Sequence, residues 1–188
     1  DAQWIATLLR AGLLKGSFIP DKTFRELRHL TRYRKSIVRD ITAQKNRIDK
    51  FLQSSGFRFT AFLSDAFGAS GRNIIRHLME YGSISREALD RCLKTQTRKR
   101  IDEILIALNG SLSEHQRNFL RMIFGHLEAL EQHRHTVEDA ITEEITKHEE
   151  ALRLLCSIPG IDVTAAAAII AEIGTDMSAF PDSQHICS

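Results

Sequence analysis

Nine lysine and arginine side chains lie between Arg25 and Lys50, against three acidic ones. Cations grouped in this way neutralise nucleic-acid phosphates and release their counterions. Steps of three and four residues place side chains on one face of a helix. The stretch therefore predicts a helix that contacts a nucleic-acid backbone, with candidate binding residues Arg28, Arg32, Arg34, Lys35 and Arg39.

A second interpretation of these cations is structural. The stretch from Glu128 to Glu150 holds eight acidic residues against Arg134 and Lys147. Opposite charge suits the pairing of a basic helix with an acidic one, near Glu138, and the cations would then serve folding. Both interpretations stay open at this point.

The stretch "LLCSIPGIDVTAAAAIIAEIG", residues 154–174, predicts two helices joined by a tight turn. Pro159 stops the first helix, Gly160 permits a left-handed backbone, and Asp162 or Thr164 can cap the second helix. In a helix-hairpin-helix, turn amides bind a DNA phosphate, so the amides of Gly160 and Ile161 are candidate binding groups. The carboxylate of Asp162 would repel that phosphate, and the alternative is a hairpin that only packs.

Metal and disulfide chemistry have little support. The histidines at 126, 133, 135 and 148 include no pair four residues apart, and the three cysteines form no C-x-x-C motif. A zinc site and a disulfide framework are therefore not expected. No apolar run approaches the roughly 20 residues that cross a bilayer, which indicates a cytoplasmic protein without a membrane partner.

Composition favours helices that position these groups. Charged residues make up 27% and aromatic residues 7% of the 188 residues, and strand-like alternation is nearly absent. We expect an all-α fold with a helix over 2–14, a long helix from Asp21 to Leu52 and a second from Ser113 to Cys156. Shorter helices between 56 and 110 would form a small helical knob.

Both long helices carry apolar residues at heptad spacing, which is typical of a coiled coil. The first seam comprises Leu27, Leu30, Ile37, Ile41, Ile48 and Phe51, with polar Arg34 and Gln44 at two further positions. The second comprises Ile123, Leu127, Leu130, Val137, Ile141, Ile145, Leu152 and Leu155. We expect a coiled-coil arm of antiparallel helices, which either packs only within the chain or also forms a dimer contact.

Three blocks carry a resemblance to a known family. They are residues 1–52, beginning "DAQWIATLLRAG", then "LSDAFGASGRNII", and the final "IPGIDVTAAAAIIAEIGTDMSAFPDSQHICS". In this order they resemble the transposases of the insertion-sequence 110/116/902 family. The resemblance implies a RuvC-like domain with a DEDD carboxylate tetrad, a coiled-coil insert, and a C-terminal domain with a catalytic serine.

On this resemblance, Asp1 matches one carboxylate of the tetrad and is the candidate catalytic and metal-binding residue. The resemblance also implies an internal segment of a longer enzyme: 1–16 as the tail of the RuvC-like domain, 17–155 as the insert, and 156–188 as the start of the serine domain. The intact enzyme would use Mg²⁺, and none is expected for this segment alone.

The implied function is DNA transposition, to which this segment would contribute dimerisation and nucleic-acid binding without being catalytically complete. The implied partners are the DNA ends of the element, a target DNA, a structured guide RNA, and further copies of the chain in a dimer or higher oligomer. The alternative is a structural coiled-coil protein with no nucleic-acid role.

Overall fold

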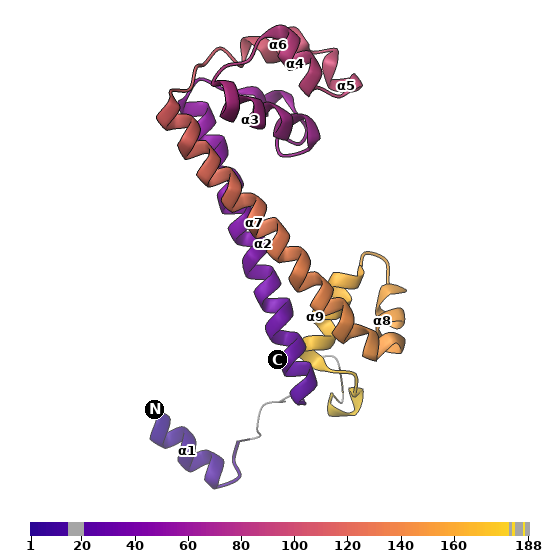
Figure 1. Ribbon diagram of the computed structural model, residues 1–188. Helices are drawn as coiled ribbons and strands as arrows, with labels where there is room; N and C mark the ends of the chain where they lie inside the picture. Colours follow the sequence, from indigo (N-terminus) through magenta and orange to yellow (C-terminus); the bar gives the residue numbers. More distant parts are fainter. Residues whose placement is uncertain (15–20, 181, 183–185, 187–188) are drawn as a thin grey trace. The chain divides into compact units, whose positions relative to one another are not determined.

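The computed structural model describes residues 1–14, 21–180, 182 and 186. Within that part of the chain every regular element is a helix, so the all-α prediction is confirmed (Figure 1). The chain divides into two compact units. Unit 1 comprises Asp1–Lys35 with Val137–Ser188, and unit 2 comprises Ser36–Thr136.

The first helix, α1 (Ala2–Arg10), is shorter than the expected 2–14. Gly12 follows it with a φ of 70°, a left-handed conformation that ends the helix. Apolar side chains such as Trp4 and Leu9 give α1 an amphipathic pattern, yet none of its residues is buried.

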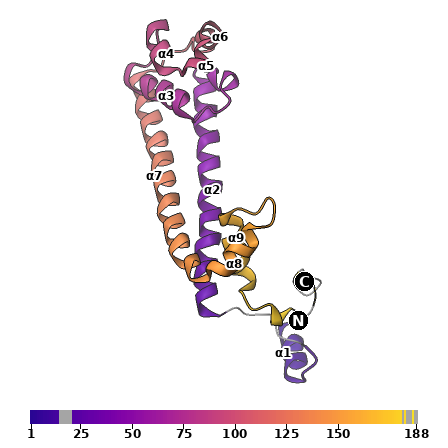
Figure 2. The ribbon, with the colours of Figure 1, turned by 90° about the vertical axis from the view of Figure 1, so that its right-hand side faces the viewer.

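Two long helices, α2 (Lys22–Ser54) and α7 (Glu114–Ile145), confirm the strongest periodic patterns of the sequence. In unit 2 they run antiparallel, because Gln44 contacts Ile123 whereas the later Phe51 contacts the earlier Phe119. Figures 1 and 2 show the two segments side by side. The Ser113 hydroxyl caps α7 by accepting from the Gln116 amide, and the Gln116 side chain accepts from the Ser113 amide.

Most of the predicted heptad residues are buried within one chain, and the others are half-buried: Leu30, Phe51, Leu130, Leu152 and Leu155. On α2 the buried positions are Leu27, Ile37, Ile41, Gln44, Ile48 and Leu52. On α7 they are Leu120, Ile123, Phe124, Leu127, Val137, Ile141 and Ile145. The seams are thus used for packing inside the chain. Buried Gln44 is satisfied because its amide donates to the Ile123 carbonyl at 2.6 Å and its oxygen accepts from Arg47.

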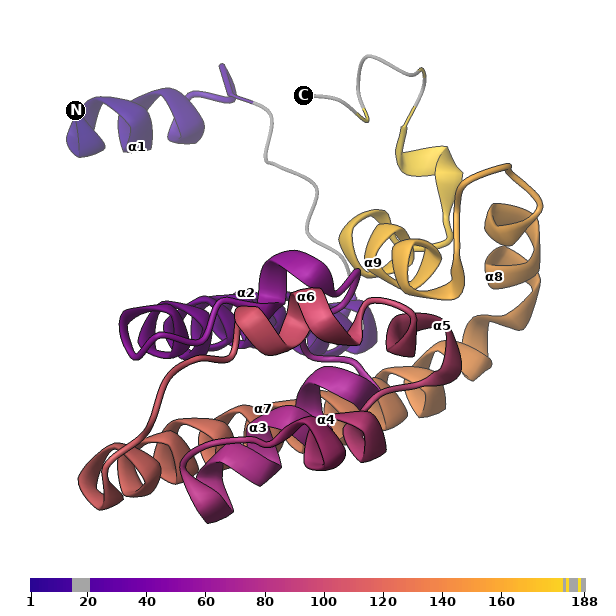
Figure 3. The ribbon, with the colours of Figure 1, turned by 90° about the horizontal axis from the view of Figure 1, so that it is seen from above.

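Unit 2 also holds the small helices α3 (Ala69–Tyr81), α4 (Arg86–Cys92), α5 (Thr95–Arg98) and α6 (Ile101–Ile106), with a 3₁₀ turn at Phe59–Phe62. Figure 3 shows α3 and α4 adjacent. The apolar residues of these elements supply the core of the knob: Phe57, Phe59, Ile74, Ile75 and Leu78 are buried, and Phe62 and Phe67 are half-buried. The Ser85 side chain caps α4 by accepting a hydrogen bond from the Ala88 amide.

A second boundary prediction is also wrong. The second long helix does not continue to Cys156, because α7 ends at Ile145 and a 3₁₀ turn at Thr146–His148 separates it from α8 (Glu149–Cys156). His148 leaves the helical conformation, with φ −124° and ψ 39°, and its ring packs against Phe24 at 4.7 Å between centroids. The aromatic contact stabilises a break that heptad spacing alone could not reveal.

Candidate nucleic-acid interface

The C-terminal hairpin of unit 1 consists of α8 and α9 (Val163–Ile173), which lie side by side (Figure 3). Gly160 in the turn has a φ of 90°, which a residue with a Cβ rarely adopts. The Asp162 carboxylate caps α9 by accepting from the Ala165 amide at 2.7 Å. Ala166 and Ala167 are buried, so the small side chains of α9 pack inside unit 1.

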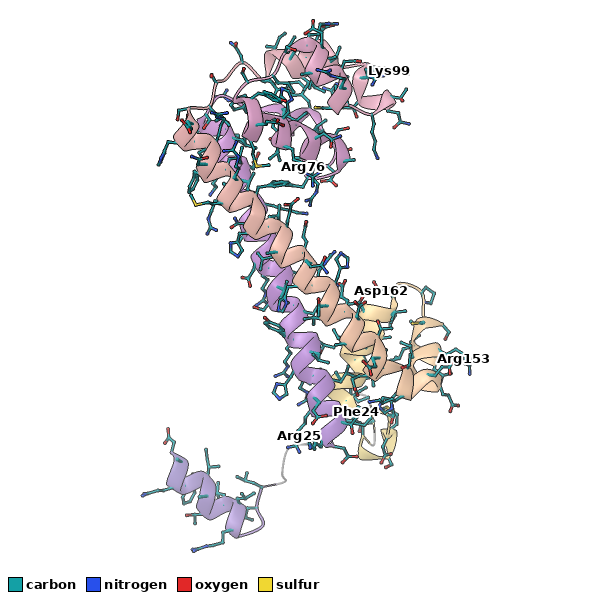
Figure 4. All side chains as sticks on the ribbon, in the orientation of Figure 1. Phe24, Arg25, Arg76, Lys99, Arg153 and Asp162 are labelled. Atoms are coloured by element: carbon teal, nitrogen blue, oxygen red, sulfur yellow. The ribbon has the colours of Figure 1, made fainter. Side chains whose placement is uncertain are left out.

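The two candidate turn amides differ in what they can still bind. The Ile161 amide donates to the Ile158 carbonyl at 3.1 Å and holds the turn closed. The Gly160 amide has no hydrogen-bond acceptor among the described residues, and Gly160 is exposed. Asp162 lies nearby at the start of α9 (Figure 4). Gly160 thus offers one amide beside a carboxylate, which makes the turn a weak phosphate site by itself.

Arg28 and Arg32 are the residues that dock α9 onto α2. Arg28 donates from Nη2 to the Glu172 carbonyl oxygen at 2.7 Å and from Nε to the Ala171 carbonyl oxygen at 3.2 Å. Arg32 donates two hydrogen bonds to the Glu172 carboxylate, from Nε at 2.9 Å and from Nη2 at 3.0 Å. A cation at the carboxyl end of a helix satisfies carbonyls that lack an intrahelical donor and complements the helix dipole.

These contacts also set the ionisation of the pair. The hydrogen bond from Arg32 is the main cause that lowers the pKa of Glu172; burial opposes it, and the charges of Arg28 and Arg32 lower the pKa further. The same hydrogen bond raises the pKa of Arg32. Because the pKa of Glu172 is lower in the folded chain, the pair stabilises the fold above the ordinary carboxyl pKa near 4.5, and this contribution is lost as the pH falls below it.

The acidic partner of the basic helix is therefore only partly the one expected. Arg34 does pair with Glu138 of α7, at 2.8 Å and half-buried. Arg28 and Arg32, however, pair with Glu172 of α9 instead, and Glu144 pairs with Lys147 of its own segment. In the sequence, the longest acidic run predicted partners on α7 only. Glu172 is a single acidic residue at the end of the apolar helix α9, so no charge pattern indicated it as a partner.

Other cations of α2 have no such partner. Lys35 and Arg39 are exposed and lie one helical turn apart, with no ion pair to any residue that the structure describes. Arg25, at the start of α2, and Arg153, on α8, are likewise exposed and unpaired within the described chain (Figure 4). These side chains are available to an external anion.

A further basic segment, residues 94–100 in unit 2, was not among the predicted candidates. Its Arg98 and Arg100 pair with Asp90 and Glu103, whereas exposed Lys94 and Lys99 have no ion-pair partner in the described part of the chain. Figure 4 shows Lys99 at the end of α5. An open pocket of about 440 Å³ adjoins the segment and includes Ser64, Lys94 and Gln96. The signal was present as the charge run "KTQTRKR", residues 94–100.

Unit 2 is also the more basic unit. It contains sixteen lysines and arginines against eleven acidic residues, whereas unit 1 contains ten against thirteen. A phosphate backbone is therefore attracted more to unit 2 and to the exposed cations of α2 than to the C-terminal hairpin.

Asp1 lies at the amino end of α1 and its side chain makes no capping hydrogen bond. Among the described residues, no group of three histidine, cysteine, aspartate or glutamate side chains could hold a metal ion. Mg²⁺ needs several oxygen ligands, so Asp1 alone does not fit a magnesium site.

Reversing the charge of Glu172 should loosen the hairpin. In Glu172→Lys the new ammonium would face both arginines, and we expect a loss of about 1–2 kcal/mol because the pairs are partly exposed. Thermal unfolding followed by circular dichroism measures the loss. The matched control is Glu149→Lys, at an exposed position of α8, which should leave the melting temperature within about 2 °C. Equal melting of the two variants would contradict the docking role.

Family comparisons match both ends of the chain. Residues 1–56 match a DEDD transposase model described as "Transposase", and residues 152–188 match a model described as "Transposase IS116/IS110/IS902 family". No curated protein and no solved structure matches the chain. In the described part of the chain, no helix is long and apolar enough to cross a membrane.

Arg28 and Arg32 lie in the first matched segment and Glu172 in the second, so the docking contacts join the two. The chain belongs to the IS116/IS110/IS902 family of transposases.

Proposed function

We propose that this chain supplies the assembly and nucleic-acid-binding part of an insertion-sequence transposase. The proposal rests on a difference among the cations of α2: some form ion pairs within the chain and others do not. Arg28, Arg32 and Arg34 hold the fold together, whereas Lys35 and Arg39 remain exposed and unpaired within the described chain. Cations that folding does not use are the ones available to phosphates.

The ligands proposed are the DNA ends of the element, its target DNA and a structured guide RNA, all bound in the cytoplasm. Lys94 and Lys99 of unit 2 extend the candidate set beyond α2. The Gly160 amide is proposed as a minor contact to phosphate. The Ile161 amide is already used within the turn, where it donates to the Ile158 carbonyl.

The proposed domain assignment follows the family: 1–16 belongs to a RuvC-like domain, 17–155 is the insert and 156–188 begins the serine domain. A DEDD transposase family implies divalent metal in the parent enzyme. Asp1 would be one of its ligands there. Since Asp1 alone does not fit the ion, we assign no catalytic step to the described residues.

Salt-dependent binding tests the nucleic-acid role. Fluorescence anisotropy of a duplex of about 30 base pairs and of an RNA hairpin, each titrated at several salt concentrations, gives the slope of log affinity against log salt. We expect Lys35→Glu with Arg39→Glu to reduce the DNA slope by about 2, because each lost phosphate contact removes roughly 0.9. Melting should be unchanged.

Arg32→Gln is the control, since it removes a docking contact and leaves the exposed cations in place. It should lower the melting temperature and leave the slope unchanged. If the unmodified chain binds neither probe at about 50 mM salt, where phosphate contacts are strong, the nucleic-acid role is wrong and the structural coiled-coil alternative stands.

Self-association is the second part of the proposal, and the sequence predicted it from the heptad spacing of the two long helices. The heptad seams themselves are already buried inside one chain. A dimer must therefore use another surface.

A further inference from the structure

From residue 115 to residue 136, one face of α7 carries no fixed charge, and exposed Glu114 lies just before it at the amino end of the helix. At 100° per residue, ten residues between 115 and 136 fall within somewhat more than a third of the helix circumference, and all ten are exposed. They form the uncharged face: His115, Asn118, Phe119, Met122, Gly125, His126, Ala129, Gln132, His133 and Thr136.

The charged residues of the same stretch all lie elsewhere on the helix. Arg117, Arg121, Glu128, Glu131 and Arg134 project from the remaining circumference, where Arg121 donates to the Met79 carbonyl and Glu128 and Glu131 pair with α3. Met122 is 66% exposed and Phe119 is 37% exposed, so large apolar side chains reach solvent on the uncharged face. A surface helix ordinarily places its charged residues on the solvent side.

The uncharged face has its own heptad spacing. Phe119, Met122, His126, Ala129, His133 and Thr136 follow at steps of three, four, three, four and three. This is the spacing that packs two helices as a left-handed coiled coil. It lies largely on the opposite side of α7 from the buried seam, which uses Leu120, Ile123, Phe124 and Leu127.

We propose that the uncharged face of α7 is the dimer interface, on which the same face of a second copy packs antiparallel. This inference rests on the self-association proposed above and specifies its surface. Nucleic acid is a poor occupant, because a phosphate backbone requires cations and the face has no lysine or arginine. A two-fold dimer requires a self-complementary surface, and a surface without fixed charge meets its own copy without repulsion.

The sequence of the face also fits an antiparallel register. If the two-fold axis passes between Leu127 and Glu128, Phe119 faces Thr136, Met122 faces His133 and His126 faces Ala129 of the other copy. In two of these three layers a ring meets a small side chain, as knobs-into-holes packing requires. Next to His126, a groove of about 270 Å³ leaves room beside the helix, and its lining includes charged Asp40 and Arg47 of α2 as well as Ala43 and Leu130.

Light scattering and sedimentation at about pH 8, where histidine is ordinarily neutral, test the surface. We expect Met122→Glu to raise the dimer dissociation constant at least about 100-fold, because the symmetric interface buries two carboxylates, each costing more than the roughly 1.4 kcal/mol that equals tenfold. Met122 is exposed in the single chain, so the variant should keep its circular dichroism spectrum and melting curve at low concentration. Asn46→Glu, at an exposed position of α2, is the matched control and should remain dimeric.

Cysteine cross-linking tests the register. In a background with Cys92, Cys156 and Cys187 replaced by serine, a mixture of His126→Cys and Ala129→Cys chains should form disulfide-linked heterodimers, and neither variant alone should cross-link efficiently. Efficient cross-linking of His126→Cys with itself would overturn the antiparallel register. If Met122→Glu remains a dimer, the surface is wrong although self-association stands. If the unmodified chain is a monomer at about 50 µM, both with and without DNA, then self-association and this surface are both wrong. That result would leave the proposed nucleic-acid binding unaffected.

Discussion

Gly71→Ala should destabilise the chain by roughly 3 kcal/mol or more and lower its melting temperature by about 6–12 °C. Gly71 is buried in the first turn of α3, and an added Cβ would lie 1.8 Å from the Ala66 carbonyl oxygen and 2.6 Å from its carbon. Both are backbone atoms, so no side-chain rotation relieves the overlap. The steric cost outweighs the helix preference of alanine, which is worth about 1 kcal/mol.

The same substitution at Gly125 is the control for Gly71→Ala. Gly125 lies in the middle of α7, and no atom of the described chain lies within 4 Å of the position that an added Cβ would take, so in the monomer alanine there should stabilise the helix by up to about 1 kcal/mol. Differential scanning calorimetry of the two variants measures both effects. A similar shift for Gly71→Ala and Gly125→Ala would show that the loop before α3 yields to the methyl group.

Ile141→Asp should unfold unit 1 and not merely dissociate a dimer. Ile141 is 6% exposed within one chain, where it belongs to the buried heptad positions of α7. The variant loses the buried side chain and places a carboxylate in the core, with an expected loss of at least about 4 kcal/mol. Urea unfolding followed by circular dichroism measures this loss.

Thr142→Asp, one residue along the same helix, separates burial from charge. Thr142 is exposed and its hydroxyl bonds only to the Glu138 carbonyl of its own helix, so stability should change by about 0.5 kcal/mol or less. A folded, monomeric Ile141→Asp chain would mean that this seam is an intermolecular interface, contrary to the burial observed within one chain.

The sequence by itself determined the helical class, the two long helices and most of their buried positions. Heptad apolar spacing, as at Ile37, Ile41, Ile123 and Leu127, is a local property of the sequence. The free energy gained by burying these side chains outweighs the cost of burying polar Gln44 among them. The caps at Ser85, Ser113 and Asp162 were predictable for the same reason, since each bonds to an amide within three residues.

Only the tertiary structure decided which partner each charge takes. Glu172 is 140 residues from Arg32 in sequence, and no periodicity links the two, yet the docking of α9 on α2 brings the carboxylate onto the guanidinium. The break of α7 before His148 likewise depends on Phe24, a residue of another helix. Charge and helix spacing specify which residues can interact, but only the folded chain determines which of the many possible pairs form. As a result, Arg28 and Arg32 are paired with Glu172, whereas Lys35 and Arg39 stay exposed.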